Sequence, residues 1–201
     1  MPGRNGDSGA PGARNHLFLF GELTPERGQE ICQKLLEDWH REYTLFINSD
    51  GGSSFDALAL VNLMKLHGRI DTVCLGVALS GAADILAAGR RRLVLPNSIA
   101  MIHQVSWDMG TEFTANLVKN ARFLERLNDV MAEMLSRDTH QSKDRLIVDM
   151  TTDHYLFGQE IIDYGLADGF YDSASLPKRL RRSGHRVPET FERPARVKEV
   201  P

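Results

Sequence analysis

Three observations predict an α/β fold of repeated βαβ units. Short β-rich runs alternate with helical runs through most of the chain, a pattern typical of sheets whose parallel strands are connected by helices. With 42% hydrophobic and 25% charged residues, the composition is that of a globular domain with its own core. After about residue 112 the alternation gives way to apolar residues at three-and-four spacing, which predicts one long helix. We therefore expect a single α/β domain from which a long helix protrudes.

Five strands are expected from runs rich in β-branched, aromatic and leucine residues. They cover residues 17–21, 44–48, 72–75, 92–95 and 99–102. A helix should follow the first strand, because Thr24 suits an N-cap and Pro25 the first helical position. Ile31, Leu35 and Trp39 follow at i, i+4 and i+8, so we expect them to form the apolar face of that helix.

Two further helices differ greatly in length. Residues 55–66 predict a helix with Leu58, Val61 and Leu66 in the core. Residues from about 112 to 139 predict a long helix, and a helix of roughly 25 residues spans about 38 Å at about 1.5 Å per residue. Its apolar positions are Leu117, Phe123 or Leu124, Leu127, Val130 or Met131, and Met134. A helix of this length exceeds what so small a domain covers, so part of the apolar stripe is expected to pack on another subunit.

The two ends of the chain have compositions that do not suit a packed core. Residues 1–15 are mostly Gly, Pro, Ala, Asn and Arg and predict a disordered arm, and residues 173–201 predict a basic, proline-containing tail. Residues 16–172 are then the folded domain. Cys32 and Cys74 form no CxxC pair, and no run of eighteen apolar residues occurs. A net charge of −3 gives no general attraction to nucleic acid or membrane. We expect a cytoplasmic protein with no metal.

A serine, a histidine and an aspartate stand at the ends of three predicted elements. Ser80 lies between a strand and a segment of small residues, His103 ends an apolar strand, and Asp153 follows the long helix. Taken singly, they are most simply a helix cap, a structural histidine and a turn residue. Together they supply the nucleophile, the base and the orienting acid of an acyl-transfer triad. Gly52, after Gly51, and Gly81 can add backbone N–H groups for an oxyanion.

Four motifs resemble the proteolytic subunit of Clp proteases, ClpP. They are INSDGGSSFDALAL, CLGVALSGAADILAAG, LPNSIAMIHQ and DHYLFGQEIIDYGLAD, in the order and near-spacing of that family, and the resemblance covers about residues 16–172. It implies the crotonase-like ClpP fold with a protruding handle helix. It also implies a serine endopeptidase with Ser80 as nucleophile, His103 as base, Asp153 as acid, and Gly52 and Gly81 as oxyanion donors.

The resemblance also implies partners. Heptameric rings of this or a second ClpP isoform would stack into a tetradecamer through the handle helix. A AAA+ unfoldase such as ClpX or ClpA would deliver unfolded polypeptides, and ATP would be used only by that partner, so the chain itself needs no cofactor. The chaperone-docking cleft corresponds to Thr44, Phe46, Val73, Leu75, Leu93 and Leu95. These positions are apolar but less aromatic than the family pattern.

Three departures indicate a divergent second isoform. Asp84 introduces a carboxylate one helical turn from Ser80, where it can pair with an arginine or oppose the oxyanion. After His103 the family's proline and glycine-rich strand are replaced by residues 105–110, VSWDMG. The family's amino-terminal axial loops are missing or replaced by the Gly/Pro-rich arm. A non-catalytic or weakly active subunit of a mixed ring is therefore an alternative, whereas an acyl-CoA enzyme of crotonase type fits poorly because nothing marks a nucleotide pocket.

Overall fold

The computed structural model describes residues 15–106 and 113–172. These residues form one α/β unit, as the sequence predicts, with seven strands in a single sheet. The predicted arm, except Asn15, and the predicted tail lie outside the described residues, and so do positions 107–110 of the altered segment. Asn15 is the first residue of the first strand.

The sheet is parallel except at one edge. Its main path runs β1-β2-β3-β4-β7, while β5 continues beside the end of β3 and β6 pairs antiparallel with β5. The strands are β1 (Asn15–Leu23), β2 (Tyr43–Gly52), β3 (Ile70–Leu79), β4 (Arg92–Val94), β5 (Ile99–Ile102), β6 (His154–Phe157) and β7 (Gly169–Phe170). The expected strands are all present, but β2 and β3 continue past the predicted ends toward the site described below.

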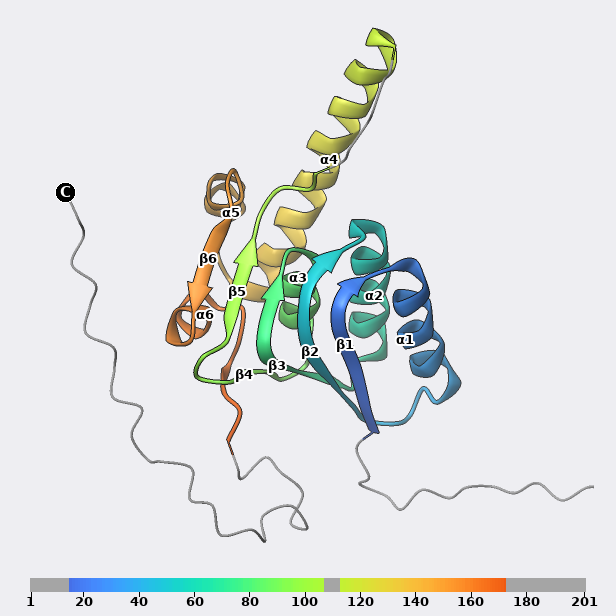
Figure 1. Ribbon diagram of the computed structural model, residues 1–201, viewed down its shortest axis with the longest axis vertical. Helices are drawn as coiled ribbons and strands as arrows, with labels where there is room; N and C mark the ends of the chain where they lie inside the picture. Colours follow the sequence, from blue (N-terminus) through green and yellow to red (C-terminus); the bar gives the residue numbers. More distant parts are fainter. Residues whose placement is uncertain (1–14, 107–112, 173–201) are drawn as a thin grey trace, which may run out of the picture.

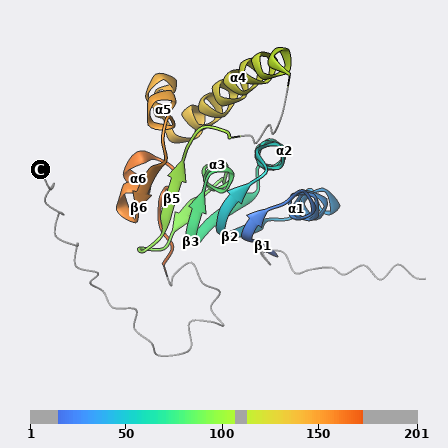
Figure 2. The same cartoon turned by 45° about the horizontal axis from the view of Figure 1, so that its top comes forward.

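Three helices cover one face of the sheet, and the other face carries none of them (Figures 1 and 2). The covering helices are α1 (Pro25–Glu37), α2 (Ser54–His67) and α3 (Gly81–Ala87). The core lies between them and the strands, with side chains such as Leu19, Ile47, Leu60 and Ile85 fully buried. The short helices α5 (Lys143–Asp149) and α6 (Gln159–Tyr164) flank β6 on the opposite side of β5 from the main sheet.

The first helix begins as predicted but ends earlier. The Thr24 side chain accepts a hydrogen bond from the Arg27 N–H, and Pro25 is the first helical residue. Ile31 and Leu35 are buried, whereas Trp39 lies beyond the helix end and packs on the His67 ring at 5.0 Å. The prediction that Trp39 extends the apolar face of this helix was therefore wrong, because the chain leaves the helical path before reaching it.

The second helix has the predicted position with a different buried face. Val61 is buried as expected, but Leu66 is 73% exposed. Ala57, Leu60 and Met64 occupy the core instead. Apolar residues occupy several sides of this helix, so the pattern alone does not single out one buried face. Packing against the sheet buries the side with Leu60, Val61 and Met64 and leaves Ala59 and Leu66 exposed.

The long helix α4 (Thr114–Thr139) has 26 residues and divides into two halves. In the C-terminal half, Leu127, Met131 and Leu135 are buried against the domain. The N-terminal half extends away from the domain (Figure 1), and Leu117 and Val118 are exposed there. Of the apolar stripe predicted as a partner surface, Leu117 and Val130 are thus exposed, whereas Leu127 and Met131 belong to the core of their own subunit.

Candidate active site

Three neighbouring strands bring the predicted triad together. Parallel pairing sets Leu79 of β3 opposite Met101 of β5, and the Ser80 N–H donates to the Met101 carbonyl oxygen at 2.8 Å. Antiparallel pairing sets Ile102 of β5 opposite His154 of β6. Each triad residue directly precedes or follows one of these paired positions. Sheet register, not sequence proximity, therefore determines where the three side chains meet.

The side chains of Ser80, His103 and Asp153 lie in a hydrogen-bonding chain. His103 Nε2 is 2.7 Å from Ser80 Oγ, and His103 Nδ1 is 3.3 Å from Asp153 Oδ1. The Asp153 side chain is 54% exposed, and its other oxygen accepts a long hydrogen bond of 3.4 Å from the Tyr155 hydroxyl. This arrangement lets a serine hydroxyl lose its proton to an imidazole that a carboxylate orients.

The backbone at Ser80 is held in an uncommon conformation. Its φ of 54° and ψ of −132° place this residue where non-glycine residues rarely lie, immediately before the first turn of α3. Such conformations persist only where the surrounding structure imposes them, and they cluster at functional sites. A sharp turn between a strand and a helix presents the serine hydroxyl outward, as in hydrolases with a serine nucleophile.

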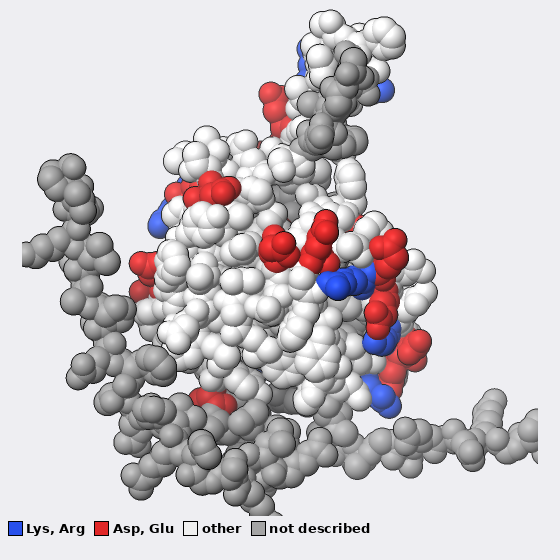
Figure 3. Space-filling view, viewed as in Figure 1, with Lys and Arg blue, Asp and Glu red and all other residues white. Residues whose placement is uncertain are grey.

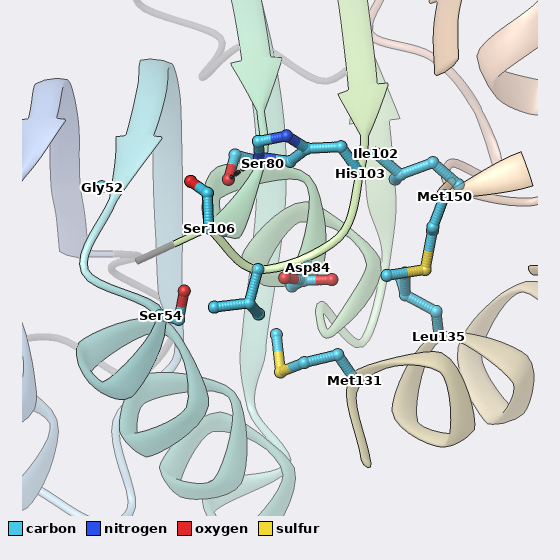
Figure 4. A pocket seen from close by; sticks show the side chains of 12 residues that line it. Gly52, Ser54, Ser80, Asp84, Ile102, His103, Ser106, Met131, Leu135 and Met150 are labelled. Atoms are coloured by element: carbon cyan, nitrogen blue, oxygen red, sulfur yellow. Dashed lines mark hydrogen bonds between the residues drawn. The ribbon is translucent and has the colours of Figure 1, made fainter. Parts of the chain in front are cut away.

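A hollow opens beside the triad (Figure 4). Gly52 and Gly81 line it together with Ser80 and His103, so both glycines predicted to supply oxyanion donors lie at the site. The rest of its lining is mixed: Ile102, Val105, Met131, Leu135 and Met150 are apolar, and Ser54, Asp84 and Ser106 are polar. Apolar side chains with a few polar groups among them are common in sites that bind organic ligands.

Comparison with known proteins decides the family. The family model described as Clp protease matches residues 13–174. The chain belongs to the Clp protease family. ClpP-type chains are serine peptidases, and the crotonase-like ClpP fold expected from the sequence is confirmed, as is the function of a Clp protease proteolytic subunit. The alternative of a non-catalytic subunit is not favoured.

Similar curated proteins come from several actinobacteria. The chain is 33% identical to the ATP-dependent Clp protease proteolytic subunit 1 of Corynebacterium diphtheriae over 167 residues, 80% of each chain. It is 33% identical to subunit 3 of Nocardia farcinica, over 80% of this chain and 76% of the relative. It is 34% identical to subunit 1 of Cutibacterium acnes, over 78% and 76%. Such differently numbered subunits are consistent with a divergent isoform.

Asp84 is the only carboxylate among the described residues that line the hollow of this Clp protease site. Its side chain lines the hollow one helical turn beyond Ser80, and the residue is only 8% exposed. Burial, together with the nearby Asp138 carboxylate, raises the pKa of Asp84 to about 8. The sequence showed that Asp84 lies four residues after Ser80, but it could not show that the Asp84 side chain faces the hollow. Of the two sequence-based options, pairing with an arginine is not seen among the described residues.

The positions predicted for a chaperone-docking cleft lie on or beside adjacent strands. Parallel register aligns Phe46 of β2 with Val73 of β3, and Val73 with Leu93 of β4. Thr44 and Val73 are buried, whereas the other four positions are partly exposed: Phe46, Leu75, Leu93 and Leu95. They share one face by strand alternation, namely the face without α1, α2 and α3. Their role in docking stays a prediction.

This face is more aromatic than the sequence indicated. Phe18 of β1 stacks on Phe46 with ring centroids 5.7 Å apart, and Tyr171 meets Phe46 edge-on at 6.2 Å. In Figure 3, much of the surface over the sheet lacks charged side chains. The register of β1 with β2 brings Phe18 here, and alternation of buried Leu17 and Leu19 with Phe18 was the signal that could have revealed it.

The described residues contain neither a metal-binding cluster nor a membrane-spanning helix. No group of three or more His, Cys, Asp or Glu side chains is arranged to hold a metal ion within residues 15–106 and 113–172. Over the same ranges, no helix is both long and apolar enough to cross a membrane. The sequence-based expectations of no metal and no cofactor remain predictions.

Proposed function

We propose that Ser80 is the nucleophile, His103 the general base and Asp153 the residue that orients His103. The 2.7 Å contact between Ser80 Oγ and His103 Nε2 is the observation that carries the assignment. As Oγ attacks a peptide carbonyl carbon, Nε2 accepts the hydroxyl proton and then passes it to the leaving amine nitrogen. Water, activated by the same imidazole, hydrolyses the acyl-enzyme and regenerates the Ser80 hydroxyl.

Asp153 supports this proton transfer from the other side of the imidazole. Its carboxylate accepts the Nδ1–H of His103 and thereby leaves Nε2 free to take the serine proton. It also stabilises the positive charge on the ring while the tetrahedral intermediate exists.

Backbone N–H groups of Gly52 and Gly81 would stabilise the oxyanion. Gly81 is the first residue of α3, so its N–H has no acceptor within that helix. Gly52 lines the same hollow at the end of β2. Loss of one such donor typically costs about 3–4 kcal/mol in the transition state. Both positions require glycine for packing, because a Cβ on Gly52 would be 2.5 Å from the Leu23 carbonyl oxygen and one on Gly81 would be 2.9 Å from the Ala57 Cβ.

Assembly and delivery complete the proposed function. Exposed Leu117 and Val118 on α4 supply apolar area for rings of this chain, alone or mixed with a second ClpP isoform, to pair into a tetradecamer. The aromatic face around Phe46 would receive loops of a AAA+ unfoldase such as ClpX or ClpA. That partner would use the ATP and deliver unfolded polypeptides. Cys32 and Cys74 are free thiols, which suits the cytoplasm.

Replacement of the proposed nucleophile tests the activity. Ser80→Ala should abolish fluorogenic peptide hydrolysis and labelling by a fluorophosphonate, while sedimentation stays as in the wild type. Thr151→Ala is the control, because it removes a hydroxyl that is exposed and bonded to the Ile147 carbonyl oxygen away from the hollow. Undiminished hydrolysis by Ser80→Ala would refute the assignment. Degradation of an unfolded protein should additionally require the unfoldase and ATP.

A further inference from the structure

We propose that Asp84 forms the base of a substrate pocket that accepts a lysine or arginine side chain, so that this peptidase cleaves after basic residues. The inference rests on the proposed role of Ser80 and adds a substrate class to it. Its starting point is one carboxyl group, Asp84, among the apolar side chains at the inner end of the hollow, which also has Ser54 and Ser106 in its lining (Figure 4).

The hollow is placed to receive the residue whose carbonyl is attacked. Ser80 and His103 stand at one end of it, and Figure 4 shows Asp84 deeper, between them and Met131. The Cα that carries this residue's side chain is bonded directly to the attacked carbonyl carbon. The side chain that enters the hollow is therefore that of the residue preceding the scissile bond. Residues 80 and 84 are separated by one helical turn, about 6 Å along the axis. The long flexible stem of lysine or arginine suits this reach and packs along apolar walls.

Asp84 has no partner of its own among the described residues. No hydrogen bond or ion pair from those residues reaches its carboxylate, although the residue is only 8% exposed. The charged residue that helps to raise its pKa is Asp138, and Asp138 already pairs with Lys65 at 2.5 Å. Buried carboxyl groups are satisfied either by a proton or by a cation. The open side of Asp84 faces the hollow, so a cation would have to come from the ligand.

The protonation state of Asp84 is compatible with a cationic ligand. With its pKa raised to about 8 by burial, the Asp84 carboxyl is mainly protonated at pH 7 in the empty site. A positive charge close to a carboxyl group lowers the pKa of that carboxyl by more than one unit, which ionises it. Binding of a basic side chain is thus coupled to release of a proton. A protonated Asp84 that only donated a hydrogen bond would instead select uncharged polar side chains.

Matched peptides test the preference. Four fluorogenic peptides that differ only before the cleaved bond, with Arg, Lys, Gln or Leu there, are assayed with the full chain. We expect kcat/KM for Arg to exceed that for Leu by at least about tenfold in the wild type. Asp84→Asn keeps the shape and the hydrogen-bonding capacity but not the charge, so it should lower the Arg-to-Leu ratio by at least about 30-fold.

A matched control removes a carboxylate of the same kind outside the hollow. Asp129→Asn breaks the pair with Lys143 on the surface of α4 and should leave the Arg-to-Leu ratio unchanged. Circular dichroism of each variant confirms that it is folded. A wild type that prefers Leu or Gln, or a ratio that Asp84→Asn does not alter, overturns the proposal.

A second readout separates this proposal from the proposed peptidase function. Fluorophosphonate labelling reports Ser80 reactivity without a basic group. If Ser80 is labelled but Arg is not preferred, only the pocket assignment fails. If Ser80 is not labelled, the peptidase function fails, and binding of fluorescent peptides that end in Arg or Leu decides the pocket. At least tenfold tighter binding of the Arg peptide, lost in Asp84→Asn, supports it, whereas equal binding of both peptides overturns it.

Discussion

Gly51 lies so close to Ser80 that a side chain on Gly51 has no room. A Cβ built at Gly51 would be 2.8 Å from the Ser80 Cβ and 2.5 Å from the Leu79 carbonyl oxygen, and the Gly51 φ is +89°. Gly51 of β2 thus packs directly against the uncommon backbone of Ser80, and only glycine fits at that position. The diglycine turn therefore positions the nucleophile as well as offering a donor from Gly52.

Gly51→Ala should lower kcat/KM by about 100-fold or more, because movement of the nucleophile by about 1 Å is enough for such a loss. Fluorophosphonate labelling of Ser80 should slow in parallel. Gly68→Ala is the matched control, since Gly68 also has a positive φ of +71° but nothing within 4 Å of its Cβ position. It should lose about 1 kcal/mol of stability and keep its labelling rate. Equal labelling rates in both variants would contradict the positioning role.

Asp153→Asn should lower kcat by about 10²- to 10⁴-fold, because the amide removes the negative charge that stabilises the imidazolium and can select the wrong tautomer. Steady-state kinetics with one peptide measures the change in kcat and in KM. Tyr155→Phe removes only the 3.4 Å hydrogen bond to Asp153 and should change kcat less than about threefold, since a bond of that length is weak. A normal kcat in Asp153→Asn would exclude Asp153 as the orienting acid.

The raised pKa of Asp84 predicts that stability falls as pH rises. The folded protein holds the Asp84 proton up to about pH 8, whereas the unfolded chain releases it near pH 4. Between those values the folded state binds the extra proton, so each pH unit lowers the free energy of unfolding by at most about 1.4 kcal/mol. Urea unfolding at pH 5.5, 7 and 8.5 should show this loss in the wild type and less of it in Asp84→Asn. Parallel pH profiles for both proteins would contradict the prediction.

Substitutions in the two halves of α4 should have different effects. Leu117→Glu lies in the exposed half and should reduce the sedimenting mass, while circular dichroism remains unchanged. Leu127→Glu buries a carboxylate in the core of its own subunit and should destabilise the fold by several kcal/mol. An unchanged sedimenting mass for Leu117→Glu would mean that the exposed stripe is not an assembly surface.

The sequence predicted elements better than it predicted which side chains meet. The alternation of strands and helices, the cap at Thr24 and the length of α4 follow from local patterns, so they could be predicted. Leu66 was misplaced because burial depends on how a helix is oriented against the sheet, and Trp39 was misplaced because the first helix ends before it. The orientation of Asp84 could not be predicted from the sequence either, because the packing of α3 against α4 turns its carboxyl toward the hollow.

Strand register has a consequence for how activity can be lost. Asp153 reaches His103 only because β6 pairs with β5 so that His154 faces Ile102. A slip of β6 by one residue would turn each of its side chains to the other face of the sheet, and the acid would leave the base. Leu156 of β6 belongs to the buried core, so the same slip would also expose its side chain. A subunit that loses activity in this way should therefore also be less resistant to unfolding, and hydrogen exchange along β6 would locate the change that thermal melting reports only for the whole domain.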